Sequence, residues 1–141
     1  MCIRDRALDR AEALGGALGP YAIQAAIAAC HARARTPEET DWVRIAALYD
    51  RLSEVSPSPV VELNRAVAVG FAEGPAEGLA IVDAIAGDKS LAQYPHLAAV
   101  RGDLLARLGR ADEARREFTR AAALSRNDRE RAVFEARASA D

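Results

Sequence analysis

Residues 95–126 have the sequence PHLAAVRGDLLARLGRADEARREFTRAAALSR, which is typical of two helices joined by a tight turn. Gly102 and Ala114 are small enough to let the two helices approach closely, and Phe118 would fill the space beside them. Between the two segments, Gly109 suits the left-handed backbone that often follows the last turn of a helix. The stretch therefore predicts an antiparallel helix pair.

Two further copies of this pattern precede it, each displaced by about 34 or 35 residues, the period of tetratricopeptide repeats. The step carries the turn at Gly109-Arg110 to Gly74-Pro75 and then to Thr40-Asp41. Repeats of this kind stack helix pairs into an array that offers an extended surface to another chain. The same steps relate Phe118 to Asp83 and Tyr49, Ala121 to Ala86 and Leu52, and Ala114 to Leu79 and Ile45.

The composition agrees with a helical fold. Half of the 141 residues are apolar, only 5% are aromatic, and alanine, the strongest helix former, dominates the apolar half. We expect an all-α fold, a right-handed stack of antiparallel helix pairs with about three tetratricopeptide-like repeats and a final capping helix. Apolar spacing predicts helices over residues 21–35, 41–55, 60–71, 76–86, 94–108, 111–124 and 128–138.

The chain divides into three parts. Residues 1–6 fit no part of the repeat, and we interpret them as a non-native leader. Residues 7–20 are expected to be a remnant helix and a linker, because Gly15-Gly16 and Gly19-Pro20 interrupt the pattern there. Residues 21–138 are the predicted tetratricopeptide-like domain.

Cysteine content and hydropathy indicate a compartment. The two cysteines, Cys2 and Cys30, are too few for a disulfide scaffold, which favours a reducing cytoplasm. The sequence has no apolar run near the length that a membrane helix needs and no signal-peptide pattern. We expect a cytoplasmic protein that makes no membrane contact.

Charge argues against nucleic-acid binding. The 19 basic and 21 acidic residues nearly cancel, which removes the general positive field that attracts phosphates. The arginine-rich C-terminal part also contains interspersed acids, as solvated helix surfaces with paired charges do. We therefore expect no direct contact with nucleic acid.

Catalytic and metal sites are not predicted. Cys30 and His31, with His96 as a third group, suggest a metal, but adjacent helix residues point about 100° apart and no second ligand pair follows. Phosphate-binding loops, nucleophile elbows and metalloprotease helices are missing from the sequence. We expect no enzyme activity, no catalytic residue and no cofactor.

Three polar residues are candidates for binding a partner: Asn64, Arg65 and Arg101. Asn64 and Arg65 lie inside the most apolar helix, whose residues we expect to be covered on several sides. In stacked repeats the first helix of each pair lines the concave surface, where an asparagine can bond a peptide backbone and an arginine an acidic group. The alternative is that Asn64 bonds the backbone of a neighbouring loop and that Arg65 pairs with Glu62 or with an acidic residue of a loop.

Five segments resemble the C-terminal extension of one group of bacterial sigma factors of the extracytoplasmic-function class. The resemblance covers residues 7–138 and depends on the segments LGPYAIQAAIAACHA (18–32), DWVRIAALYD (41–50), SPVVELNRAVAV (58–69), GPAEGL (74–79) and RGDLLARLGR (101–110). It implies the tail of a promoter-recognition subunit of RNA polymerase. Such a tail would regulate transcription initiation by contacting the sigma core domains, the polymerase or another protein.

The sequence departs from that family in one respect. No segment resembles the polymerase-binding helical domain or the helix-turn-helix that reads promoter DNA. The resemblance therefore implies a fragment that does not initiate transcription alone. A free-standing tetratricopeptide-like adaptor for a protein or peptide partner is the alternative, and an enzyme with a pocket between helices is a more distant one.

Overall fold

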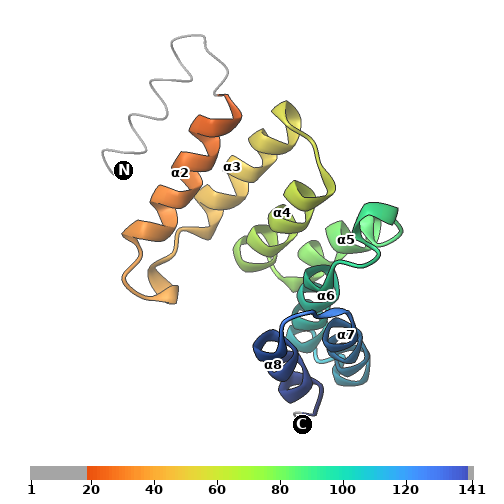
Figure 1. Ribbon diagram of the computed structural model, residues 1–141. Coiled ribbons are helices and arrows are strands. Elements are labelled where there is room, and N and C mark those ends of the chain that lie inside the picture. The colour runs from red at the N-terminus through yellow and green to blue at the C-terminus, as the bar shows by residue number, and fades with distance from the viewer. Residues whose placement is uncertain (1–18, 140–141) are drawn as a thin grey trace.

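The computed structural model describes residues 19–139, and every regular element among them is helical. Figure 1 shows the helices following one another from α2, in orange, to α8, in blue. The predicted all-α fold is confirmed, and each of the seven helices expected over residues 21–138 is found within two residues of its expected bounds. The helices are α2 (Pro20–Arg33), α3 (Trp42–Val55), α4 (Pro59–Ala72), α5 (Pro75–Ile85), α6 (Pro95–Arg107), α7 (Ala111–Leu124) and α8 (Asp128–Ser139).

Short 3-10 turns at Pro37–Glu39 and Lys89–Leu91 occupy two of the connections. The expected leader, residues 1–6, lies outside the described residues. So does most of the expected remnant helix and linker at residues 7–20, of which the structure describes only the end, Gly19 and the first residue of α2.

Local signals determine where the helices begin. Proline is the first residue of α2, α4, α5 and α6, a position at which its missing N–H costs no hydrogen bond. Three of the described helices have a side-chain cap at their start. Ser58 Oγ accepts from the Val61 N–H, Asp41 Oδ1 from the Arg44 N–H and Asn127 Oδ1 from the Glu130 N–H, each at 3.1 Å. The chain is therefore divided into helices by residues that act locally.

The three predicted turns each precede the second helix of a pair. Gly109 has a φ of 81° and Gly74 a φ of 132°, values that residues with a side chain rarely adopt. The third turn, at Thr40-Asp41, contains no glycine and uses the Asp41 cap instead.

One part of the repeat alignment is corrected by the structure. The step aligns Phe118 of α7, which is buried, with Asp83 of α5, which is exposed. The buried residue at this place in α5 is Val82, with 0% exposure. Ala86, related by the step to buried Ala121, is exposed because α5 has 11 residues and ends before it, while α7 has 14. A step of 35 residues back from Ala111 places the start of α5 one residue too late, at Ala76 instead of Pro75, and it does not predict the length of α5.

The buried side chains form two clusters that share α4. One cluster, within α2 to α4, includes Ile23, Ile45, Leu52 and Val69. The other lies within α4 to α7 with Phe134 of α8 packed on it, and includes Leu63 and Phe118. As its sequence predicted, α4 is covered on several sides and connects the two halves of the stack.

The close approach of α6 and α7 has the predicted cause. A Cβ placed on Gly102 would lie 3.0 Å from the ring of Phe118, closer than side chains normally pack. Because Gly102 has no side chain, the Phe118 ring can pack directly against its backbone. Phe118 is 3% exposed. Gly78 has the same role between α5 and α4, since a Cβ there would lie 2.8 Å from the Ala66 carbonyl oxygen.

Candidate functional site

A groove of about 440 Å³ lies between α2, α3 and α4. Its floor is apolar, and none of the residues that line it is acidic, lysine or arginine. This is unusual for a chain in which 28% of residues are charged. The lining residues are Gln24, Ile27, Ala28 and His31 from α2, Tyr49 and Leu52 from α3, and Val60, Val61 and Asn64 from α4.

Three of the polar groups that line this groove have no hydrogen-bond partner in the described part of the chain: the side chains of Gln24, Tyr49 and Asn64. Burial raises the pKa of the Tyr49 hydroxyl above its ordinary value, so Tyr49 stays a neutral donor at physiological pH. The groove therefore combines apolar contact area with free amide and hydroxyl groups.

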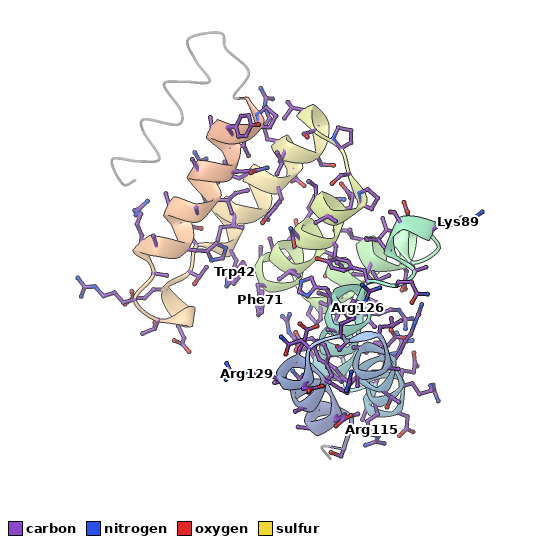
Figure 2. The ribbon with its side chains drawn as sticks, in the orientation of Figure 1. Trp42, Phe71, Lys89, Arg115, Arg126 and Arg129 are labelled. Atoms are coloured by element: carbon purple, nitrogen blue, oxygen red, sulfur yellow. The ribbon has the colours of Figure 1, made fainter. Side chains whose placement is uncertain are left out.

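A row of aromatic rings begins at His31, one of the residues that line the groove. The ring of His31 meets Trp42 edge-on, with centroids 5.5 Å apart, and Trp42 stacks on Phe71 of α4 at 4.5 Å. Figure 2 shows the Trp42 and Phe71 side chains next to each other at the ends of their helices. Arg107 of α6 continues the set, with its guanidinium 4.6 Å from the Phe71 ring centroid.

Of the three predicted binding residues, only Asn64 lies in this groove. Arg65 instead pairs with Asp50 of α3 at 3.1 Å and with Glu62 at 3.0 Å. Burial opposes the charge of Arg65, but these two carboxylates hold its pKa above the ordinary value. For Arg65, the structure shows the alternative that the sequence left open, an ion pair with a neighbouring acid.

Arg101 has a similar arrangement one repeat later. Its guanidinium donates to Asp83 of α5 at 2.9 Å and to Glu117 of α7 at 3.2 Å. Asp83, which the repeat step aligned with a buried position, therefore serves as an ion-pair partner. Arg65 and Arg101 therefore each connect the first helix of a pair to the preceding second helix through an ion pair.

Sequence reasoning did not identify Gln24, Tyr49, Phe71 or Arg107 as members of one site. The available signal was the run of uncharged residues at three- and four-residue spacing along α2 and α4. His31 contacts Trp42, and His96 lies beside Tyr94. Within residues 19–139, no three His, Cys, Asp or Glu side chains are grouped as metal ligands would be.

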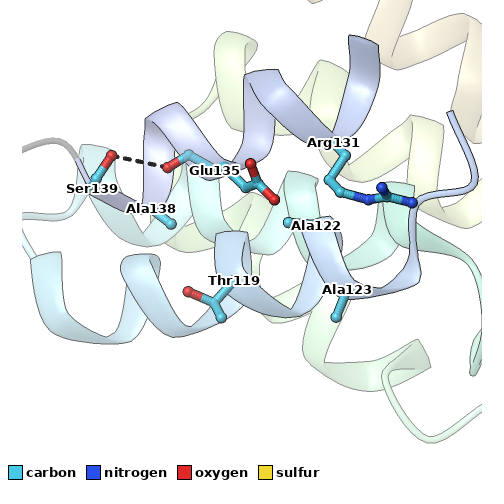
Figure 3. Close-up of a pocket in the computed structure, with 7 residues that line it drawn as sticks. All are labelled: Thr119, Ala122, Ala123, Arg131, Glu135, Ala138 and Ser139. Carbon is cyan, nitrogen blue, oxygen red and sulfur yellow. Dashed lines mark hydrogen bonds between the residues drawn. The ribbon is translucent and has the colours of Figure 1, made fainter. Parts of the chain in front are cut away.

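A second hollow of about 490 Å³ lies between α7 and α8 (Figure 3). Its polar side chains are mostly engaged locally: Thr119 donates to the Arg115 carbonyl, Ser139 to the Glu135 carbonyl, and Arg131 to the Ser125 carbonyl. The rest of its wall is largely alanine. We therefore regard the groove between α2, α3 and α4 as the candidate site.

None of the described helices is long and apolar enough to span a membrane.

Comparison with known proteins gives one informative relative. The chain is 54% identical over 116 residues to an uncharacterized protein of Rhizobium meliloti (strain 1021). The match covers 82% of this chain but only 27% of the relative, so the chain spans about a quarter of the length of the curated relative that it matches. No protein-family model matches the sequence, and no solved structure matches it.

Proposed function

We propose that this chain is the regulatory C-terminal domain of a bacterial RNA polymerase sigma factor of the extracytoplasmic-function class. It would act in transcription initiation by protein–protein contact, with the sigma core domains, the polymerase or another protein as partner. In this proposal promoter DNA is bound by other domains of the complete protein, and the domain works in the cytoplasm without a cofactor.

The observation that supports the proposal most is where the family-like segments lie. The segments at residues 18–32, 41–50 and 58–69 contribute every residue that lines the groove except Leu52. A groove with an apolar floor, free amides and no charged lining is suited to holding part of another chain. The length of the relative also agrees, since nearly three quarters of it lies outside the matched segment and leaves room for polymerase- and DNA-binding domains.

The full-length relative from Rhizobium meliloti provides the test. We expect the purified protein to bind RNA polymerase core enzyme and to direct transcription from a specific promoter. Removing the 116-residue segment that matches this chain should change the amount of transcript while leaving core binding measurable. A full-length relative that neither binds core enzyme nor supports promoter-specific transcription would refute the proposal.

The genomic sequence that encodes this chain supplies a second test. We expect the reading frame upstream of the codon for Ala7 to encode a polymerase-binding helical domain and a helix-turn-helix. A stop codon and ribosome-binding site there would instead identify a free-standing adaptor, which is the alternative function.

A further inference from the structure

We infer that the groove between α2, α3 and α4 binds an extended segment of a partner protein, apolar and uncharged along the groove and acidic where it reaches Arg107. This inference specifies the partner contact of the proposed function, but it can be tested with the chain alone. Three features carry it: the neutrality of the groove, its unpartnered polar groups and the position of Arg107.

The absence of acidic, lysine and arginine side chains from the groove lining determines which side chains the central part of the bound segment can have. One face of α2 presents Tyr21, Gln24, Ala28 and His31 at three- and four-residue spacing, and one face of α4 presents Val60, Asn64, Val67 and Phe71. Three apolar side chains on these faces are substantially exposed: Tyr21 at 89%, Phe71 at 47% and Val60 at 44%. A charged side chain placed here would lose water without gaining a counter-charge, so apolar side chains are favoured.

The unpartnered polar groups favour an extended backbone over a helix. In a helix the main-chain N–H and C=O groups already bond one another, and only side chains are free to meet a groove. An extended segment keeps its main-chain donors and acceptors free. The amides of Gln24 and Asn64 can each donate and accept, and the Tyr49 hydroxyl can do the same, which matches such a backbone.

Arg107 determines the charge that we expect at one end of the bound segment. One guanidinium nitrogen donates to the Gly70 carbonyl at 2.8 Å, which holds the side chain over the Phe71 ring. Arg107 is exposed and forms no ion pair with any carboxylate of residues 19–139. Its remaining donors are available for a carboxylate, and arginine suits that partner because it can bind both oxygens.

The distances between residues along α4 determine how long the bound segment is. Asn64 and Phe71 lie two turns apart on α4, about 10 Å at the rise of a helix. An extended chain covers that distance in about three residues, and the full span from Val60 to Phe71 in about five. We therefore expect the acidic residue about three positions from the part of the segment that contacts Asn64 and about five from the part that contacts Val60.

The test is a selection of binders from a random peptide library displayed on phage, with the 141-residue chain as the immobilised target. We expect enriched sequences with an uncharged apolar stretch and an acidic residue at the spacing given above. Synthetic peptides of these sequences, followed by fluorescence polarisation, should bind Asn64→Ala and Tyr49→Phe about tenfold more weakly than wild type. Arg107→Gln should remove the advantage of the acidic peptide over its amide analogue.

Gln93→Ala is the matched control, because Gln93 is an exposed amide outside the groove. Its peptide affinity should equal that of wild type, and helical circular dichroism should show that every variant is folded. Four outcomes would overturn the inference: no enrichment, enrichment of helical heptad patterns or basic sequences, affinity unchanged in Asn64→Ala, or self-association that buries the groove. None of these requires polymerase, so failure here is distinguishable from failure of the proposed sigma-factor function.

Discussion

At the scale of single residues, Gly102 shows most directly how one position determines packing. A Cβ at this position would meet three ring atoms of Phe118 at 3.0–3.1 Å, and the ring is enclosed in the core. We expect Gly102→Val to lower the free energy of unfolding by about 1–3 kcal/mol, the usual cost of overpacking a core. Urea denaturation monitored by circular dichroism would measure the change.

Gly87→Val is the control for this prediction. A Cβ at Gly87 meets no atom within 4 Å, so the same substitution should change stability by less than about 0.5 kcal/mol. Equal stability of Gly102→Val and wild type would mean that the ring does not limit how closely α6 and α7 approach.

The surroundings of Glu62 predict that the stability of the fold depends on pH. Burial alone would raise the pKa of Glu62, but hydrogen bonds from Ser53 and Arg65 and the charge of Arg65 hold it below its ordinary value of 4.5. A carboxyl whose pKa is lower in the folded state stabilises the fold above its unfolded pKa and loses that effect as pH falls through the folded pKa. Wild type should therefore lose stability below a pH of 4.5 more steeply than Glu62→Gln.

Chemical denaturation at a series of pH values between neutral and acidic would measure these slopes. Glu54→Gln is the matched control, since Glu54 is an exposed carboxylate with one distant partner, Arg51, at 3.7 Å. Its slope should follow that of wild type. Identical slopes for wild type and Glu62→Gln would show that the bonds from Ser53 and Arg65 do not favour the charged carboxylate.

At the scale of elements, caps determine how firmly each helix begins. Ser58 precedes α4, the helix shared by both clusters, and its hydroxyl accepts a hydrogen bond from the Val61 N–H. We expect Ser58→Ala to destabilise the protein by about 1 kcal/mol, because that N–H would lose its partner. The midpoint of thermal unfolding provides the measurement.

Ser56→Ala tests whether the effect of Ser58→Ala is due to the cap. Ser56 lies two residues earlier, and its side chain makes no hydrogen bond in the part of the chain that the structure describes. This variant should unfold within about 0.5 kcal/mol of wild type. A loss at Ser56 as large as that at Ser58 would point to general sensitivity of the loop rather than to capping.

Local signals explain why the helices could be predicted from sequence. Pro59, Pro75 and Pro95 each begin a helix, and Gly109 ends one, through conformational limits that apply wherever these residues occur. The length of α5 could not be predicted by the repeat step, because nothing in a period of 34 or 35 residues indicates that one helix stops early. Val82, not Asp83, is the buried counterpart of Phe118, because Val82 follows Pro75, the first residue of α5, by as many residues as Phe118 follows Ala111, the first residue of α7.

At the scale of the whole molecule, the site depends on contacts that no local pattern contains. Gln24, Tyr49 and Asn64 come from three different helices, and they meet only because α2 and α4 pack on either side of α3. Glu62 could be named from sequence as a partner of Arg65 because it lies three residues away, but Asp50, the other partner of Arg65, and Asp83, a partner of Arg101, lie 15 and 18 residues away. The sequence therefore predicted Asn64 as a candidate without showing the site to which it belongs.

The arrangement of two clusters around α4 makes a prediction about how the whole stack unfolds. In a repeat array each helix pair is stabilised mainly by its neighbours, so a local defect should loosen the nearest units first. Phe118→Ala removes a buried ring from the C-terminal cluster, and Ile45→Ala removes a buried side chain from the N-terminal one. We expect losses of about 3–5 and 2–5 kcal/mol, respectively.

Native-state hydrogen exchange would show where each loss appears. In Phe118→Ala, the backbone amides of α6 and α7 should lose most protection, and in Ile45→Ala those of α2 and α3 should. The amides of α4 should lose protection in both variants, because α4 contributes to both clusters. Arg116→Ala, an exposed change on α7, should leave protection unchanged and stability within about 0.5 kcal/mol. If instead each core variant lowered protection equally from α2 to α8, the stack would unfold as one cooperative unit and α4 would not separate two neighbouring halves.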